Sequence, residues 1–240
     1  MRIVNFIAKK SGLGKSHAKA LLASHEVFLN HSLVTDGAVP VAKFDHLMAG
    51  SEIFQSREPR YILLHKPVGV VSATTDPNYS TVIDLIKTAY AHDLHLAGRL
   101  DRASTGLMIL TNNSKFSESI TRPENKIPKR YLIETDVPIT EEAIEKFRTG
   151  MRFDKEKIRT APAMFFGITP TSCRLTIYEG KHHQIKRMFL RFDIRVVTLH
   201  REAIGSIELP PALKSGQWME LPDAPKQLLE FGDCSAPMSS

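Results

Sequence analysis

The sequence predicts an α+β protein with a small N-terminal module and a larger domain whose mixed, largely antiparallel sheet is flanked by helices. Hydrophobic residues make up 42% of the 240 residues and charged residues 24%, which is the balance of a folded globular chain. Residues 51–59, SEIFQSREP, are polar and end at a proline, as a linker does. Beyond them, strand patterns follow one another without a regular strand–helix–strand alternation. We therefore expect domains at 1–50 and 60–233, a linker at 51–59, and a frayed tail at 234–240.

The N-terminal module is predicted from two helical patterns and a hairpin pattern. Apolar residues recur with helical spacing at Ile3, Phe6 and Ile7, and again at Ala18, Leu21 and Leu22. Gly12 and Gly14 separate the two patterns, and Ser16 is a candidate N-cap for the second helix. Residues 27–29 and 33–34 are apolar and flank Asn30-His31, which predicts a β-hairpin with a two-residue turn.

The larger domain is predicted from short apolar runs and three helical patterns. We expect strands at 61–65, 68–72, 107–110, 131–135, 174–178 and 195–199. A helix is expected at 81–90 from its apolar stripe and a Thr81–Asp84 capping box. Ser114 is expected to cap a second helix, and a third at 140–148 has acids at its start, bases at its end and Gly150 as a left-handed cap.

Basic residues are grouped in this chain, which has a formal net charge of +6. The first 25 residues contain Lys15, Lys19 and three other basic residues but no acidic residue, and two further basic clusters span 122–130 and 181–201. Any one cluster is equally well explained as a solvated surface. Three clusters together favour a phosphate backbone as partner, because each neutralised phosphate releases counterions.

The same composition argues against several other classes of protein. Cys173 and Cys234 are the only cysteines, and no CxxC pair or zinc-ligand spacing occurs, so we expect no disulfide framework, no metal and no cofactor. His182 and His183 are adjacent and should point to different faces of any helix or strand. No apolar stretch approaches the roughly 20 residues that span a bilayer, and no signal peptide is evident, so we expect a cytoplasmic protein without membrane contact.

One polar loop contains a carboxylate between two arginines. Arg99, Asp101 and Arg102 precede the apolar run 107–110, which is typical of a loop that leads into a buried strand. An isolated loop aspartate more often caps a helix or binds backbone amides. Here the arginines favour an ionised carboxylate, and the strand behind the loop would hold it rigidly.

Four segments together resemble the motifs of the RNA pseudouridine synthases. Gly98-Arg99-Leu100-Asp101 with Ser104-Thr105-Gly106-Leu107 resembles the catalytic motif of that family. Three other segments match in the expected order between residues 60 and 205: Lys66-Pro67-Val68-Gly69, Lys129-Arg130-Tyr131-Leu132 and YEGKHHQIKRMF at 178–189. Several concurrent motifs are far more specific than one.

Residues 2–45 are similar to the S4 RNA-binding module that precedes the catalytic domain in one branch of the family. Lys15 stands where Arg is usual, His25 where Gly is common, and Asn30-His31 where Asn-Gly is typical. The segments LHLAGRLD, TRPENK with KRYL, and LHREAIG look most like enzymes that modify one uridine of small-subunit (16S) ribosomal RNA. Synthases acting on large-subunit (23S) RNA share most of these features.

The resemblance implies roles for individual residues. Asp101 would either attack the nucleotide or abstract a ribose proton, and both routes remain open. Lys186, where many relatives have Arg, is the first choice for the basic partner of Asp101, with Lys181 as the alternative. Tyr131 would receive the flipped uracil by stacking. Without the family, Lys186 would pass as a surface lysine and Tyr131 as a core aromatic.

The resemblance also implies an RNA-binding surface. Its predicted members in the catalytic domain are Arg99, Arg102, Lys129, Lys181, His183, Gln184 and Arg187, and in the N-terminal module Lys15 and Lys19. We expect a monomer that acts on ribosomal RNA, within a subunit or an assembly intermediate. Three alternatives are a 23S synthase, a non-catalytic RNA-binding assembly factor on the same scaffold, and a glycosidase that releases uracil.

Overall fold

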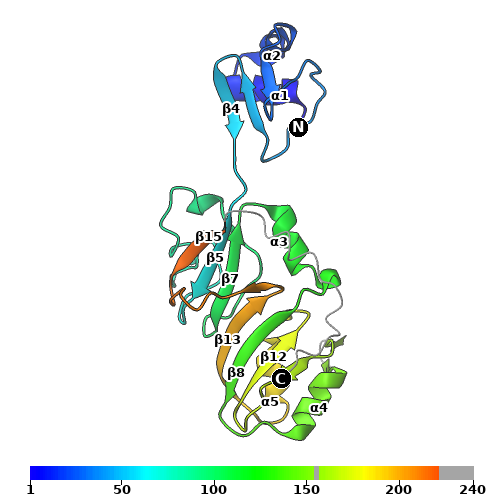
Figure 1. Cartoon of the computed structure of the whole chain (residues 1–240), viewed down its shortest axis with the longest axis vertical. Helices are drawn as coiled ribbons and strands as arrows, with labels where there is room; N and C mark the ends of the chain where they lie inside the picture. The colour runs from blue at the N-terminus through cyan, green and yellow to red at the C-terminus, as the bar shows by residue number, and fades with distance from the viewer. Residues whose placement is uncertain (154–156, 222–240) are drawn as a thin grey trace. The chain divides into compact units, whose positions relative to one another are not determined.

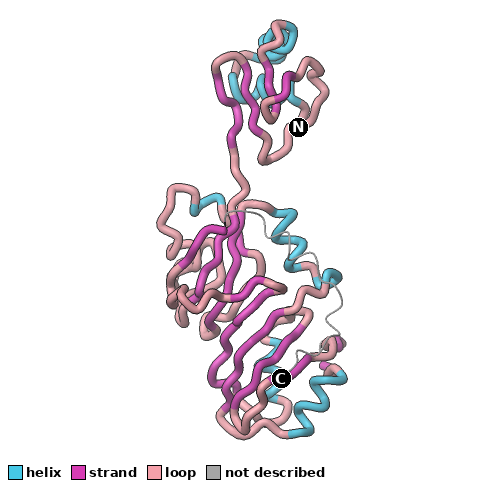
Figure 2. Tube along the Cα trace, in the orientation of Figure 1, coloured by secondary structure: helices cyan, strands magenta, loops and turns pink. Residues whose placement is uncertain are grey.

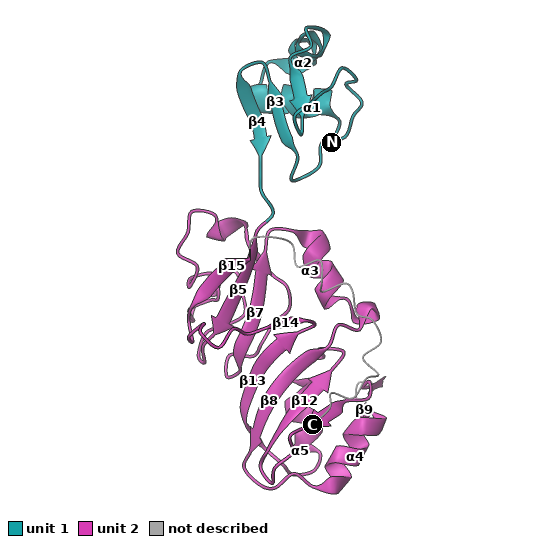
Figure 3. Ribbon diagram, viewed as in Figure 1, with its two compact units in different colours: residues 1–59 teal, residues 60–240 magenta. Residues whose placement is uncertain are grey.

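A computed structural model describes residues 1–153 and 157–221 of the chain. The chain divides into two compact units, Met1–Pro59 and Arg60–Ser240 (Figure 3). The predicted tail at 234–240 and Cys234 lie outside the described residues. Within the described ranges, no helix has the length and apolar character needed to span a membrane.

Unit 1 packs two helices on a four-stranded sheet. Its elements are α1 (Ile3–Ser11), α2 (Gly14–Ala23), β1 (Val27–Leu29), β2 (Ser32–Leu33), β3 (His46–Ala49) and β4 (Glu52–Ser56). The strand order is β2-β1-β3-β4. Ile3 and Ile7 of α1 and Ala18 and Leu22 of α2 are buried together, as the helical spacing of these apolar residues predicts.

Two expectations for this unit were wrong. Ser16 lies inside α2, whose N-cap position is Leu13, because the helix already begins at Gly14. Residues 52–56, assigned to the linker, form β4 and pair with β3, because Phe54 inserts into the core of unit 1. The chain therefore leaves unit 1 only after Pro59.

The predicted hairpin is confirmed, with Leu29 opposite Ser32 across the turn. Asn30 and His31 have φ of 50° and 65°, the left-handed pair that a two-residue hairpin turn requires. His25 also has a positive φ, 59°. His25 and His31 are the two positions where glycine was expected, and both adopt a left-handed conformation that costs a side chain more than glycine.

Unit 2 contains, within its described part, a nine-stranded sheet with the main order β11-β12-β8-β13-β7-β5-β15; β14 pairs with β13 and β6 with β7 (Figure 1). Its strands are β5 (Tyr61–Lys66), β6 (His95–Leu96), β7 (Thr105–Thr111), β8 (Lys129–Thr135), β11 (Met164–Phe166), β12 (Ser172–Ile177), β13 (Val196–Ile204), β14 (Ile207–Glu208) and β15 (Trp218–Leu221). The remaining elements are η1 (Ala91–Asp93), α3 (Ser114–Thr121), η2 (Pro123–Asn125), α4 (Glu141–Thr149), α5 (Gln184–Leu190), and the pair β9 (Arg152–Phe153) and β10 (Ile158–Arg159). Among the strand pairs of this sheet within the described residues, β13 with β7 is the one parallel pair, which confirms the predicted α+β fold with a mixed, largely antiparallel sheet.

The two faces of this sheet bury different hydrophobic clusters. Along β7, Met108 and Leu110 belong to one cluster and Leu107 and Ile109 to the other, as the alternation of a strand dictates. Residues of α4 and α5 belong to the first cluster and residues of α3 to the second. Figure 2 shows the helices (cyan) of unit 2 beside its strands (magenta). The sheet therefore separates two hydrophobic clusters, and side chains on its two faces lie in different surroundings.

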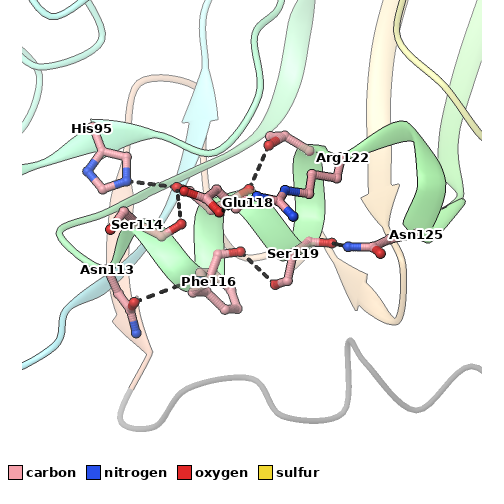
Figure 4. Close-up of polar contacts among 10 residues, drawn as sticks. His95, Asn113, Ser114, Phe116, Glu118, Ser119, Arg122 and Asn125 are labelled. Atoms are coloured by element: carbon pink, nitrogen blue, oxygen red, sulfur yellow. Dashed lines mark hydrogen bonds and ion pairs between the residues drawn. The ribbon is translucent and has the colours of Figure 1, made fainter.

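Helix α3 begins one residue earlier than expected. Asn113, not Ser114, is the N-cap, and its side-chain oxygen accepts a hydrogen bond from the amide of Phe116 (Figure 4). At the other end, Arg122 pairs with Glu118 at 2.9 Å, and the Asn125 amide donates to the Ser119 carbonyl at 2.7 Å. Asn and Ser are equally good N-caps, and Asn113 takes this role because its backbone is extended (φ −97°, ψ 100°) whereas Ser114 is already helical.

Helix α4 has the expected cap and charge pattern but a different end. Thr140 Oγ1 accepts from the Ala143 amide, acids occupy the first turn, and bases occupy the last. Gly150 has φ 84° but ψ 138°, so it is not the predicted left-handed cap. A Cβ on Gly150 would lie 2.5 Å from the Thr160 carbonyl, so this glycine permits a close approach of two backbones.

Two predicted elements do not form. Residues 68–72 make only an isolated bridge between Val71 and Thr81, because Gly69 has φ 88° and donates its amide to the Arg102 carbonyl instead of to a strand. Residues 81–90 form turns rather than a helix. The hydrogen bonds of the Thr81–Asp84 capping box do form. The β-branched residues that follow have low helix propensity, and the burial of Val82 and Ile86 holds the backbone in a non-helical conformation.

Candidate active site

The predicted catalytic loop connects β6 to β7 and is held from several sides. Ser72 Oγ donates to the Leu100 carbonyl at 2.6 Å and lies 3.1 Å from the Leu100 amide. Gly106, with φ 106°, allows β7 to approach β13, since a Cβ there would lie 2.3 Å from the Arg201 carbonyl oxygen. The loop is therefore anchored on both sides of Asp101.

Asp101 is paired through both of its carboxylate oxygens. Lys186 Nζ lies 3.3 Å from Oδ2, and His183 Nε2 lies 3.2 Å from Oδ1. The Asp101 side chain is 28% exposed, so it remains accessible to a substrate. Lys181, the alternative partner, instead pairs with Glu179 at 3.0 Å.

Helix α5 brings these two partners to the loop. Ile185, Met188 and Phe189 are buried, which leaves Lys186 at the edge of the helix where its stem can reach Asp101. His183 is the N-cap residue and has φ 48° and ψ 30°. The His182 and His183 rings stack 3.9 Å apart. The expectation that they point to different faces of a helix or strand is not tested, because both residues lie in the turn before α5.

A pocket beside Asp101 has Tyr131 in its wall. Its polar and charged lining comes from the catalytic loop, β8 and the segment before α5: Arg99, Asp101, Ser104, Tyr131, Lys181, His183 and Gln184. Tyr131 is 6% exposed and lies in register with Leu175 and Arg201 on the neighbouring strands. The carboxylate and an aromatic wall therefore share one pocket.

A second, larger pocket of about 380 Å³ is lined by Arg130, Arg174, His200 and Glu202 among others. Arg130 and Tyr131 are neighbours on β8, so this pocket opens on the opposite face of the sheet. Its arginines are already paired with Glu202, at 3.2 Å from Arg130 and 3.1 Å from Arg174. The smaller pocket, with Asp101, is the better candidate because it contains the reactive side chains.

Lys66, which sequence reasoning passed over as a site residue, lies directly behind the loop. It is fully buried, and its ammonium donates to the carbonyls of Ser104 at 2.8 Å and Pro67 at 2.9 Å, with Arg102 at 3.4 Å. Burial lowers the pKa of Lys66 to about 8, although the Asp101 charge opposes this. The sequence signals for this role were its place at the end of a predicted strand and in the Lys66-Pro67-Val68-Gly69 motif.

Arg201 supports the loop from β13. It is 3% exposed, and its Nε donates to the Leu107 carbonyl at 2.7 Å, while Nη1 lies 3.4 Å from the Arg99 carbonyl. Its charge adds to burial in lowering the pKa of Lys129 to about 8. Lys129 is thus near this buried cation, but it does not line the Asp101 pocket.

The other predicted RNA contacts are distributed more widely. Gln184 is engaged internally, because its Nε2 donates to Glu179 and its Oε1 accepts from the Lys181 amide. Arg102 lies over the Tyr79 ring, and Arg187 over the Phe153 ring, and neither lines the pocket. Lys15 and Lys19 are exposed on α2 of unit 1. Among the described residues, no group of three or more His, Cys, Asp or Glu side chains is arranged to hold a metal ion.

Comparisons with known proteins identify the family of this chain. The family of RNA pseudouridylate synthases matches residues 60–191. The ribosomal small subunit pseudouridine synthase A of Pseudomonas aeruginosa is 40% identical over 92% of this chain and 96% of its own length, and that of Escherichia coli K12 is 37% identical over the same shares. A crystal structure of a pseudouridylate synthase, 32% identical, superposes with a TM-score of 0.68 over 95% of this chain and 99% of that one. The chain therefore belongs to the RNA pseudouridylate synthases, the enzymes that isomerise uridine in RNA to pseudouridine.

Proposed function

We propose that this chain converts one uridine of small-subunit ribosomal RNA to pseudouridine, with Asp101 as the catalytic residue. The relatives at 37–40% identity are named for the small ribosomal subunit, and they match nearly the whole chain. The proposal places the enzyme in the cytoplasm, acting as a monomer on RNA in a subunit or an assembly intermediate. Unit 1, with exposed Lys15 and Lys19, is the proposed S4-like RNA-binding module.

The reaction explains why one carboxylate suffices. The bond from ribose C1′ to uracil N1 breaks, the base rotates, and C1′ bonds to C5, which then loses its proton to solvent. Ordinary glycoside hydrolysis needs a second carboxylate because it must activate water or protonate a leaving group. Here the detached uracil is recaptured, so Asp101 has only to attack the nucleotide or to remove a ribose proton.

The single observation that carries the proposal is the placement of Asp101 in one pocket with Tyr131. The target base must leave its stack, and an aromatic face can receive it by stacking worth about 1–3 kcal/mol. Lys186 and His183 occupy one carboxylate oxygen each, so the acid is oriented and its negative charge is balanced. Arg99, which also lines the pocket, is a proposed contact for the target phosphate.

Tritium release from RNA labelled at uridine C5 tests the proposal directly. Formation of the C1′–C5 bond releases the label, so 16S ribosomal RNA should lose tritium with the wild-type protein. Asp101→Asn keeps the size of the side chain and should abolish release while RNA binding persists. A wild-type protein that binds the RNA without releasing tritium would instead be an assembly factor, and free uracil would identify a glycosidase. Release from 23S RNA alone would contradict the small-subunit assignment.

A further inference from the structure

In the described part of unit 2, two arginines lie over tyrosine rings, and there only Arg60 also pairs with a carboxylate. Arg60 lies 4.1 Å from the centre of the Tyr90 ring and also pairs with Glu220 at 2.8 Å. Arg102 lies 4.3 Å from the centre of the Tyr79 ring, and within residues 1–153 and 157–221 no carboxylate comes within ion-pairing distance of its guanidinium. Within these ranges, the Arg102 guanidinium therefore contacts an aromatic face and has no countercharge.

The loop that carries Tyr79 is fixed by four hydrogen bonds, two to Asp76 and two to Val71. Asp76 Oδ1 accepts from the amides of Asn78 and Tyr79 at 2.9 and 3.0 Å, which makes a tight polar turn before the ring. At its end the loop is tied to Val71, whose amide donates to the Ser80 carbonyl at 3.0 Å and whose carbonyl accepts from the Val82 amide at 3.0 Å. Tyr79 is nevertheless 47% exposed, so the ring is ordered by its backbone rather than by burial.

Arg102 is fixed through its backbone as well. Its carbonyl accepts from the Gly69 amide at 2.8 Å and lies 3.4 Å from Lys66 Nζ. The guanidinium is one residue from Asp101, exposed, and outside the pocket that would receive the base. A cation so placed can reach the RNA backbone beside the flipped nucleotide while leaving the pocket free.

We propose that Tyr79 is a positioning residue, whose ring holds the Arg102 guanidinium ready for a phosphate next to the target uridine. The inference rests on the proposed function, because it needs RNA bound at Asp101. A free arginine side chain would lose rotamer entropy on binding a phosphate, and the Tyr79 ring removes part of that cost beforehand. Tyr79 therefore acts through Arg102 and not on the reacting atoms.

The test is a set of variants assayed by tritium release from C5-labelled 16S ribosomal RNA. Tyr79→Ala should raise KM about two- to fivefold, the value of an exposed cation–π contact, with kcat unchanged. Tyr79→Phe keeps the ring and should restore the wild-type KM. Tyr90→Ala removes the equivalent ring from Arg60 and is the matched control, for which KM should not change.

A double variant with Arg102→Gln tests whether Tyr79 acts through Arg102. If Tyr79 acts through Arg102, adding Tyr79→Ala to Arg102→Gln should raise KM no further. An additional rise in the double variant would mean that Tyr79 contacts RNA itself, and an unchanged KM in Tyr79→Ala alone would mean that the ring positions nothing; either result overturns the inference. Absence of tritium release from the wild type would refute the proposed function instead, so the two failures are distinguishable.

Discussion

Replacing Lys66 with Met tests whether the buried ammonium orders the catalytic loop. Methionine keeps the length and apolar stem of the side chain but cannot donate to the carbonyls of Pro67 and Ser104, which lie 2.9 and 2.8 Å from Nζ. Hydrogen bonds from a charged donor contribute about 1.5–3 kcal/mol each, so the two short ones together contribute about 3–6 kcal/mol. The third contact, 3.4 Å to the Arg102 carbonyl, is too long to add much.

The cost of burying the Lys66 charge reduces the loss of stability expected for Lys66→Met. Burial lowers the pKa of Lys66 from its usual 10.5 to about 8, so the fold disfavours the charged form by about 3 kcal/mol, and Met removes that cost. The net loss in the free energy of unfolding should therefore be at most about 3 kcal/mol. Turnover should suffer more, because a displacement of Asp101 by about 1 Å can cost about 100-fold in rate.

Urea denaturation and single-turnover tritium release measure the two effects separately. The exposed Lys87→Met is the matched control and should change neither quantity. Wild-type turnover in Lys66→Met, with the hydrogen bonds removed, would refute the idea that Lys66 orders the loop.

The same residue predicts a pH dependence with a definite sign. The folded chain binds the Lys66 proton less tightly than the unfolded chain, so the stability penalty is complete below pH 8 and disappears as the pH rises towards 10.5. Between pH 8 and 10.5, the free energy of unfolding of the wild type should therefore rise relative to that of Lys66→Met. A difference that stays constant from pH 7 to 10.5 would contradict the lowered pKa.

Three further predictions concern the RNA module and the sheet. The double variant Lys15→Ala, Lys19→Ala should bind RNA more weakly, and the slope of log K against log salt concentration should become shallower by about 1.4–1.8. An unchanged slope would exclude these lysines as phosphate contacts. Gly106→Ala should destabilise the protein by more than about 4 kcal/mol, because its Cβ would collide with the Arg201 backbone; a soluble variant with a wild-type urea midpoint would contradict this packing. His25→Gly should raise the stability of the protein by about 0.5–1 kcal/mol by relieving a left-handed side chain, and the urea midpoint should rise; a lower midpoint would count against strain at this site.

The parts of the fold predicted from the sequence are those fixed by local patterns. The strand β7 with its apolar run, the strand β8 and the capped helix α4 form close to their expected bounds. The helix expected at 81–90 had equally good local signals, including its capping box, and yet only the box forms. There the tertiary positions of Val82 and Ile86 override a weak helix propensity, which a sequence pattern does not show.

The same limit applies to the site. Asp101 and Lys186 could be placed together because each occurs in a recognisable motif, and α5 orients Lys186 by its apolar stripe. Lys66 and Arg201 act on backbone carbonyls that are 38 and 94 residues away along the chain. Every residue type has the same backbone carbonyl, so the sequence does not show which carbonyls these two side chains bind. Only the folded structure shows these hydrogen bonds.

Mapping pseudouridine across both ribosomal RNAs in cells that lack this protein tests the central claim most directly. The account predicts that one site in 16S RNA disappears, that the wild-type gene restores it, and that the Asp101→Asn gene does not. Loss of a 23S site, or restoration by Asp101→Asn, would contradict it.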